Sequence, residues 1–118
     1  VKVNDLALTV LDKASQVLQR YPTINLTVAG HTDNNPPSRK SNVDNWNVSA
    51  QKAATIVRIL TEDYDFSSSQ ILLGAHGEFK PRTSNATPSG KKENRRVELI
   101  MAPRAEDLVR AIRGVIEK

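Results

Sequence analysis

Apolar residues recur at steps of three and four between residues 5 and 21, which is the spacing of one face of an α-helix. Asn4 stands before this segment as a predicted N-cap, and Pro22 follows it, where proline disfavours helical geometry in the preceding residue. The pattern predicts an amphipathic helix with its apolar face toward a core. The positions on that face are Leu8, Leu11, Ala14, Val17, Leu18 and Tyr21.

Shorter apolar runs after this helix indicate strands. Residues 24 to 28 alternate strictly between apolar and polar side chains, which predicts a strand with one buried side. Two further apolar runs of strand length occupy residues 70 to 75 and 97 to 101. Polar loops rich in turn-forming residues are expected at residues 34 to 44 and 77 to 93.

Two more segments carry the apolar stripe of a helix. The first has Asn45 or Asn47 near its start and is expected to end near Tyr64. Its stripe consists of Val48, Ala53, Ile56, Val57 and Leu60. The second follows Pro103 and covers residues 104 to 118, with a stripe made of Leu108, Val109, Ile112, Val115 and Ile116.

Helices that alternate with strands predict an α+β fold, a two-layer sandwich in which helices pack on one face of a small mixed β-sheet. The length of 118 residues is that of one compact domain, so residues 1–118 are expected to form a single domain that ends in a helix over residues 104–118. The unbroken apolar stretches are only a few residues long, whereas a membrane-spanning helix needs about 20.

The composition excludes several kinds of chemistry. The chain has no cysteine, which rules out disulfides, thiolate metal sites and a cysteine nucleophile. Its formal net charge of +4 and pI near 9.6 favour anionic partners such as nucleic acid, phospholipid headgroups or an anionic cell-wall polymer. With two tyrosines, two phenylalanines and one tryptophan, it offers few platforms on which nucleic-acid bases can stack.

Four short motifs, in order along the chain, resemble those of one protein family. Residues 30 to 34, Gly-His-Thr-Asp-Asn, resemble the Gly-His-Thr-Asp signature of OmpA-like peptidoglycan-binding domains, the module that OmpA, Pal and MotB share. Residues 45 to 53 are similar to the family's Asn-x-x-Leu-Ser-x-x-Arg-Ala helix start, and their Asn-Trp opening is closest to MotB. Residues 76 to 81 and 94 to 98 resemble Tyr-Gly-Glu-x-x-Pro and Asn-Arg-Arg-Val-Glu. The resemblance implies a βαβαβ arrangement whose first strand is missing or reduced to residues 1 to 3.

The resemblance also implies a non-catalytic domain that binds peptidoglycan through the diaminopimelate of its stem peptides. This group displays an ammonium and a carboxylate, and the chain offers opposite charges for them in Asp33, just past a strand end, and Lys52, early in the next helix. On this interpretation Asp33 accepts from the ammonium, while Lys52 and the helix N-terminus hold the carboxylate. The matching positions Thr32, Asn45 and Arg95 complete the polar lining.

The chain departs from the family pattern at two of these positions. Lys52 stands where the family has arginine, and His76 stands where it has tyrosine. Lysine presents a point charge, whereas arginine presents a planar two-pronged donor, so the first difference bears directly on ligand affinity.

Two alternatives belong to other functional classes. The positive charge and the basic pairs at residues 91–92 and 95–96 are compatible with a nucleic-acid-binding module, although no known reading motif accompanies them. His31, Asp33 and His76 are residue types that can form the metal set of a hydrolase, although the two histidines are far apart and no His-Glu-x-x-His pattern occurs. Peptidoglycan is therefore the expected partner, and no enzyme activity, cofactor, metal or nucleic-acid partner is expected.

A wall-binding domain implies a periplasmic location in a bacterial cell envelope. We expect the sequence to be a trimmed fragment of a larger protein, MotB-like or OmpA-like, that reaches a membrane only through a segment outside these residues. MotB-like domains are dimers as a family, so a homodimer is compatible with this interpretation.

Overall fold

The computed structural model describes residues 5–37, 42–103 and 113. Three predicted features fall outside the described residues: the Asn4 cap, the strand at residues 1–3 and, apart from Arg113, the helix over residues 104–118. In chain order the elements are α1 (Asp5–Arg20), β1 (Ile24–His31), α2 (Asn45–Asp63), the 3₁₀ helix η1 (Ser68–Gln70), β2 (Ile71–Ala75), α3 (Pro88–Asn94) and β3 (Arg96–Pro103).

The strands form one mixed sheet in the order β2-β1-β3. β1 runs parallel to β2 and antiparallel to β3, so that Leu26 lies opposite Ile71 on one side and Met101 on the other. A parallel pair requires a crossover connection, and α2 lies within the one between β1 and β2. The predicted α+β fold with a small mixed sheet is confirmed.

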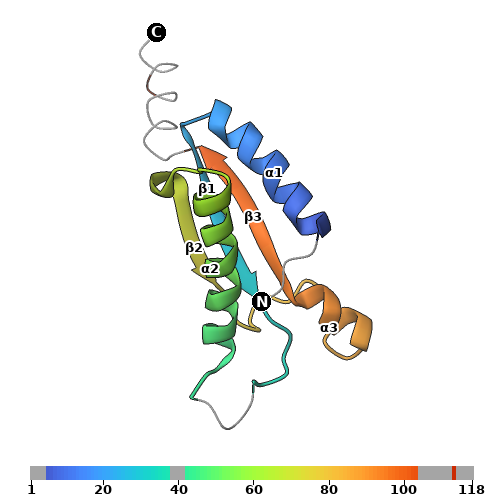
Figure 1. Ribbon diagram of the computed structural model, residues 1–118. Coiled ribbons are helices and arrows are strands. Elements are labelled where there is room, and N and C mark those ends of the chain that lie inside the picture. Colours follow the sequence, from blue (N-terminus) through green and yellow to red (C-terminus); the bar gives the residue numbers. More distant parts are fainter. Residues whose placement is uncertain (1–4, 38–41, 104–112, 114–118) are drawn as a thin grey trace.

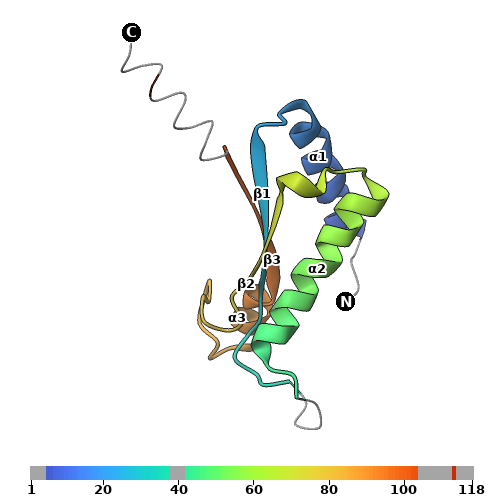
Figure 2. The same ribbon diagram turned by 90° about the vertical axis from the view of Figure 1, so that its left-hand side faces the viewer.

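The helices and the sheet make two layers. Figures 1 and 2 show α1 and α2 over the same face of the sheet. The alternation along β1 directs Leu26 and Val28 into the core beneath the helices, where neither is exposed at all. Most of the apolar stripe of both helices packs against these side chains. Val17 and Tyr21, expected on the buried face of the first helix, are instead 47% and 54% exposed, and Tyr21 lies beyond the last residue of α1. The buried cluster comprises Leu11, Leu18, Leu26, Val28, Ala53, Ile56, Leu60 and Phe66.

The first turn of α2 is fixed by a capping box. The spacing predicts Asn45 or Asn47 near this start; both lie in the first turn, and the N-cap itself is Asp44. The Asp44 carboxylate accepts from the backbone N–H of Asn47 at 3.0 Å, and the Asn47 side chain accepts from the backbone N–H of Asp44 at 3.1 Å. The box uses asparagine where glutamate or glutamine is usual, which explains why the sequence does not show the standard signature.

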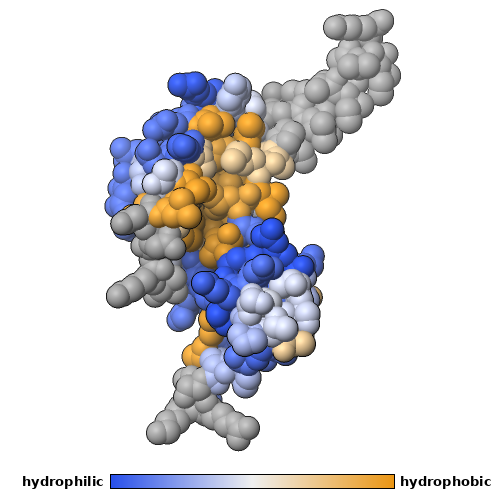
Figure 3. Space-filling model, turned by 90° about the vertical axis from the view of Figure 1, so that its right-hand side faces the viewer, coloured by the Kyte–Doolittle hydropathy of each residue, from blue (hydrophilic) through white to orange (hydrophobic). Residues whose placement is uncertain are grey.

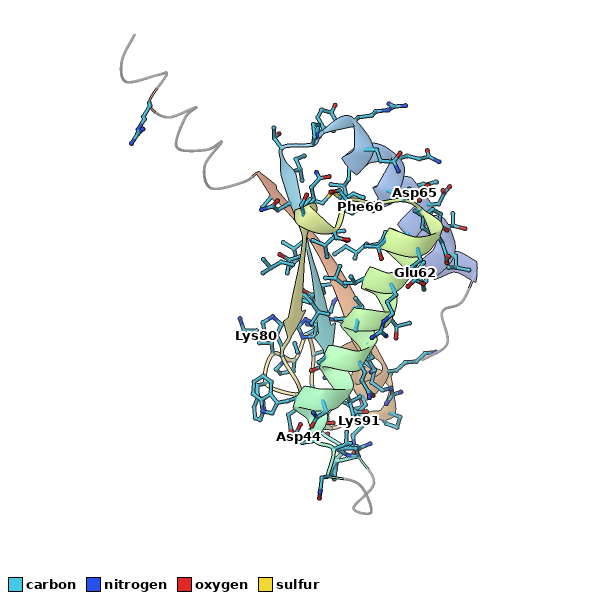
Figure 4. All side chains as sticks on the ribbon, turned by 60° about the vertical axis from the view of Figure 1, so that its left-hand side comes forward. Asp44, Glu62, Asp65, Phe66, Lys80 and Lys91 are labelled. Carbon is cyan, nitrogen blue, oxygen red and sulfur yellow. The ribbon has the colours of Figure 1, made fainter. Side chains whose placement is uncertain are left out.

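The other end of α2 turns the chain back into the core. Asp65 adopts a φ of 53°, unusual for a residue other than glycine, just after the C-cap Tyr64. The backbone N–H of Phe66 then donates to the carbonyl oxygen of Leu60 at 2.9 Å, and the Phe66 residue is only 3% exposed. Figure 4 shows Asp65 and Phe66 at the opposite end of α2 from Asp44.

The stretch from residue 77 to residue 93, expected to be a polar connector, ends in the seven-residue helix α3. Thr87 is its N-cap and accepts from the backbone N–H of Gly90 at 3.1 Å, and Pro88 occupies the first helical position. The expectation of a loop throughout is therefore wrong. A helix this short and polar has no apolar stripe, so the periodicity of the sequence does not reveal it.

Some apolar side chains remain on the surface. Leu6, Val10 and Val17 on α1, together with Ile100 and Met101 on β3, are at least 46% exposed. Figure 3 shows the face that lies on the right-hand side of Figure 1. It carries apolar surface next to a hydrophilic lobe around α3. Within the described ranges, no helix has the length and apolar character that crossing a membrane requires.

Candidate functional site

The predicted site residues gather at one end of the sheet because of the strand directions. β1 and β2 run parallel, so their carboxyl ends meet at the same edge, and antiparallel β3 begins there. Gly30 lies opposite Ala75, and His31 lies opposite Arg96. The N-terminal end of α2, marked by Asp44, and Lys91 on α3 are at this same end of the molecule (Figure 4). Residues just after β1, early in α2 and just before β3 are therefore neighbours.

Asp33 and Arg95 form an ion pair at this end. Nη1 of Arg95 donates to Oδ2 of Asp33 at 2.6 Å, and the backbone N–H of Asn35 donates to Oδ1 at 2.9 Å. The Asp33 side chain is 7% exposed, whereas that of Arg95 is 46% exposed. Burial alone raises the pKa of Asp33, but the bonds from Asn35 and Arg95 and the charges of Arg95 and Lys91 outweigh it, so the pKa lies below its ordinary value. Asp33 is thus a carboxylate at neutral pH, and its cationic partner Arg95 is accessible to solvent.

Lys52 lies on the side of α2 that faces this pair. Its Nζ donates to the carbonyl oxygen of His31 at 3.4 Å. Burial lowers the pKa of Lys52; the charge of Asp33 raises it and the charge of Arg95 lowers it, with a net decrease. The ammonium, the carboxylate and the guanidinium are therefore close enough to influence one another. Two cations share the site with one anion.

Thr32 and Asn45 hold the loop that carries Asp33. The Thr32 hydroxyl donates to the carbonyl oxygen of Asp33 at 2.8 Å, and its backbone N–H donates to the carbonyl oxygen of Gly77 at 2.9 Å. The Asn45 side-chain amide donates to the carbonyl oxygens of Asp33 at 3.4 Å and of Asn35 at 3.1 Å. Both residues are buried. The structure thus brings the five predicted site residues together, with Thr32 and Asn45 as supports for the loop.

A third cation at this end does not follow from the family motifs. Nζ of Lys91 donates to Oδ1 of Asn35 at 2.7 Å, and its charge contributes to the lowered pKa of Asp33. The sequence shows Lys91 only as one member of a basic pair on an expected loop. Its placement depends on α3, which the sequence pattern does not reveal.

Asn94 is a structural residue whose role the sequence pattern does not indicate. It is completely buried, and its Oδ1 accepts from the backbone N–H groups of Arg82 at 2.8 Å and Thr83 at 3.0 Å. Its Nδ2 donates to the carbonyl oxygen of Thr83 at 2.9 Å and to Oδ1 of Asn85 at 2.8 Å. Asn94 directly precedes Arg95, so these bonds fix the point from which the Arg95 side chain reaches Asp33. The one feature of the sequence that points to Asn94 is its position as the first residue of the fourth motif.

The two histidines form a separate cluster beside the site. Their rings stack with centroids 4.9 Å apart, and Nε2 of His31 lies 3.7 Å from Oε2 of Glu98. Among the residues that the structure describes, neither ring nitrogen of His31 has a hydrogen-bond partner. In the part of the chain that the structure describes, no three or more His, Cys, Asp or Glu residues are placed to hold a metal ion, and Asp33 pairs with Arg95. The metal set of His31, Asp33 and His76 is therefore not assembled there.

Comparison with known sequences identifies the family. The sequence matches the OmpA family over residues 3–95, which is most of its length. The chain belongs to the OmpA family. This OmpA-family domain is 34% identical over 90 residues to Motility protein B of Bacillus subtilis (strain 168), a match that covers 76% of this chain and 34% of that protein. It is 32% identical over 92 residues to Peptidoglycan-binding protein ArfA of Mycobacterium bovis, covering 78% of this chain and 27% of that protein.

Solved structures place the OmpA-family domain within the same fold. The crystal structure of the C-terminal domain of Helicobacter pylori MotB matches with a TM-score of 0.77, covering 98% of this chain and 87% of that one. The two sequences are 21% identical, so this likeness concerns the fold. The domain spans only about a third of the length of the curated relatives described above, 34% of one and 27% of the other.

Because His31 is buried, we expect the OmpA-family domain to lose stability under mild acid. Burial and the charge of Arg96 lower the pKa of His31 below its ordinary 6.5; His76 and Lys80 act in the same direction, while Glu98 opposes them. The unfolded chain therefore takes up the proton first, so stability is complete above pH 6.5 and falls as the pH drops from 6.5 through the folded pKa. Urea unfolding should show a lower midpoint at pH 5.5 than at pH 7.5.

A variant separates His31 from the other titrating groups. His31→Gln should reduce the difference between the midpoints at the two pH values, because glutamine does not titrate. The carboxyl pKa values of Asp33 and Glu98 lie below their ordinary 3.8 and 4.5, so neither group titrates in this window. Equal midpoints for the unmodified domain at both pH values would contradict the prediction.

Proposed function

We propose that this OmpA-family domain binds peptidoglycan without catalysis and attaches a larger envelope protein to the cell wall. The observation that carries the proposal is the convergence of a buried carboxylate, Asp33, with the cations Arg95 and Lys52 at one end of the sheet. Groups of both signs in one place suit a ligand that itself carries both signs. A relative named for peptidoglycan binding, 32% identical over 92 residues, supports the same ligand.

The ligand group that we propose is the zwitterionic end of diaminopimelate in a stem peptide. The ammonium of the ligand binds the carboxylate of Asp33. The carboxylate of the ligand binds the guanidinium of Arg95, and the ammonium of Lys52 is a second cation beside it. The internal Asp33–Arg95 pair is then exchanged for two pairs with the ligand, which is feasible because the Arg95 side chain is 46% exposed and a ligand can therefore reach it. Arg95 supplies the two-pronged donor that Lys52 cannot offer, so a lysine at position 52 is compatible with binding.

The proposed ligand also sets the proposed location. Peptidoglycan lies outside the cytoplasmic membrane, so the domain acts in the periplasm or its equivalent in the cell envelope. The matched part is 34% of the length of Motility protein B. We therefore propose that the domain is one module of a MotB-like or OmpA-like protein whose membrane anchor is a separate segment.

Removing the Asp33 charge is the direct test. Asp33→Asn and Arg95→Gln should each weaken retention on purified sacculi by at least about 30-fold, because loss of one member of a hydrogen-bonded charge pair that the bound ligand covers costs about 2 kcal/mol or more in binding. The measurement is cosedimentation with sacculi over a range of protein concentrations. Free diaminopimelate should compete with sacculi for the unmodified domain.

Arg58→Gln is the matched control, because Arg58 is exposed on α2, six residues beyond Lys52, and the substitution removes the same charge as Arg95→Gln. It should leave retention unchanged. Circular dichroism at 222 nm confirms that each variant is folded. Unchanged retention of folded Asp33→Asn and Arg95→Gln would overturn the proposed site. Retention that oligonucleotides abolish and diaminopimelate does not would instead favour the nucleic-acid alternative.

A further inference from the structure

An exposed pair of stacked aromatic rings lies outside the ionic site. Trp46 comes from the first turn of α2 and Phe79 from the turn after β2, and their ring centroids are 5.1 Å apart with 29° between the planes. Trp46 is 50% exposed and Phe79 is 62% exposed. Single exposed apolar side chains are ordinary, but here two elements remote in sequence place their rings together and leave them facing water. The pair forms one broad aromatic surface.

The two rings stand on a shared, hydrogen-bonded support. The Ser49 hydroxyl accepts from the backbone N–H of Gly77 at 3.0 Å and donates to the carbonyl oxygen of Trp46 at 3.0 Å. Gly77 has a φ of 57°, which lets the chain turn sharply after β2, and the Phe79 N–H closes this turn by donating to the His76 carbonyl oxygen at 3.2 Å. The surface is therefore preorganised, and a ligand that lies on it need not order it first.

The same support reaches the ionic site. The carbonyl oxygen of Gly77 accepts from the backbone N–H of Thr32 at 2.9 Å, and Thr32 directly precedes Asp33. Asn45, next to Trp46, donates to the carbonyl oxygen of Asp33 at 3.4 Å. In Figure 4, Lys80, which follows Phe79, and Lys91, beside Asn35, lie on either side of the start of α2. The aromatic surface and the ionic site thus occupy the same end of the molecule in a fixed relation.

We propose that Trp46 and Phe79 form a stacking platform for an amino-sugar ring of the glycan strand. This proposal rests on the proposed function, since peptidoglycan is a polymer in which sugar rings carry the stem peptides. One face of a pyranose ring presents C–H groups that pack on an aromatic ring, while its hydroxyl and acetamido groups stay in water. An exposed platform at the surface suits that geometry, whereas a fully apolar partner would favour an enclosed pocket. The ionic site binds the peptide, and the platform binds the adjoining glycan.

Trp46 is the only tryptophan of the chain, so its fluorescence reports the platform directly. The probe is a β-1,4-linked tetramer of N-acetylglucosamine, which has no peptide and no ionised group. Titration into the unmodified domain should change the emission saturably. Phe79→Ala should weaken binding of the tetramer by about 5- to 100-fold, the range expected for losing an aromatic stacking contact. Leu72→Ala, which removes another exposed apolar side chain, on β2, should leave it unchanged.

Asp33→Asn separates the two proposals. It should lose retention on sacculi and keep the response to the tetramer, because it alters the ionic site alone. If the unmodified domain is retained on sacculi but does not respond to the tetramer, or if Phe79→Ala responds as the unmodified domain does, the platform proposal is overturned while the wall-binding function stands. If the tetramer binds and sacculi do not, the wall-binding function fails instead. If Phe79→Ala changes only the sedimentation coefficient, the rings are a contact between copies and the platform proposal is overturned.

Discussion

Gly30→Ala should destabilise the domain by about 3 kcal/mol or more, which is a large part of the stability of a small domain. An added Cβ at Gly30 would lie 1.9 Å from the backbone oxygen of Ser49 and 2.8 Å from its carbonyl carbon. Both are backbone atoms of α2, so no side-chain rotation relieves the clash. The strand and the helix must move apart. The loss is measured as the change in free energy of unfolding in urea.

Gly74→Ala is the matched control in the same sheet. A Cβ at Gly74 would meet its nearest atom, the Cβ of Ala29, at 3.7 Å, which is ordinary van der Waals contact. This substitution should change the free energy of unfolding by less than about 1 kcal/mol. Similar losses for the two variants would show that strand β1 and helix α2 are not held in the close contact described here. That contact also lets Lys52 reach the carbonyl oxygen of His31, so Gly30→Ala should impair sacculus binding as well.

Asn94→Ala should cost about 2 to 4 kcal/mol of stability and also weaken binding to sacculi. The substitution leaves the backbone N–H groups of Arg82 and Thr83, whose bonds to Asn94 are part-buried, without their acceptor, and an unsatisfied group costs about 1 to 3 kcal/mol when it is buried. The segment before α3 loses its anchor, and Arg95 loses its fixed starting point. Urea unfolding and cosedimentation with sacculi measure the two effects.

Asn85→Ala provides a graded comparison, because the Asn85 side chain takes part in just one of the Asn94 bonds, at 2.8 Å, and is partly exposed. Its loss should stay below about 1 kcal/mol. Asn94→Asp keeps the acceptor for Arg82 and Thr83 but cannot donate, so its stability should lie between those of the unmodified domain and Asn94→Ala. A stability of Asn94→Ala equal to that of Asn85→Ala would contradict this account of the segment.

The predictions for Gly30 and Asn94 concern residues that position the candidate site, not residues that would contact a ligand. The charged groups are few, and each is placed by a backbone contact or an amide network that lies behind it. Gly30 brings β1 and α2 together, and Asn94 sets the start of the segment that carries Arg95. We therefore expect ligand affinity to be sensitive to substitutions that remove no ligand contact.

The periodic elements could be predicted from the sequence because burial repeats with their local geometry. Leu11 and Leu18 on α1, and Leu26 and Val28 on β1, occupy the core that the spacing indicates. Two features could not be predicted in this way, because apolar periodicity does not determine them. The Asp44 cap depends on a reciprocal bond to Asn47, and α3 has no apolar face.

The members of the candidate site could be named from the sequence, but their contacts could not. Motif resemblance selects Asp33, Lys52 and Arg95, but Asp33 and Arg95 are 62 positions apart, and their pairing requires β3 to begin where β1 ends. The positions of Lys91 and Asn94 likewise depend on α3.

The residue pattern of this chain alone sets the type and order of its main elements and the amino acids available for binding, since side-chain periodicity and identity are local properties. The folded arrangement sets the rest: the ion pair between Asp33 and Arg95, the buried amide of Asn94, and the aromatic surface of Trp46 and Phe79. Each of these joins segments that are distant in sequence, and the parallel pairing of β1 with β2 and the antiparallel pairing of β1 with β3 bring those segments to one end.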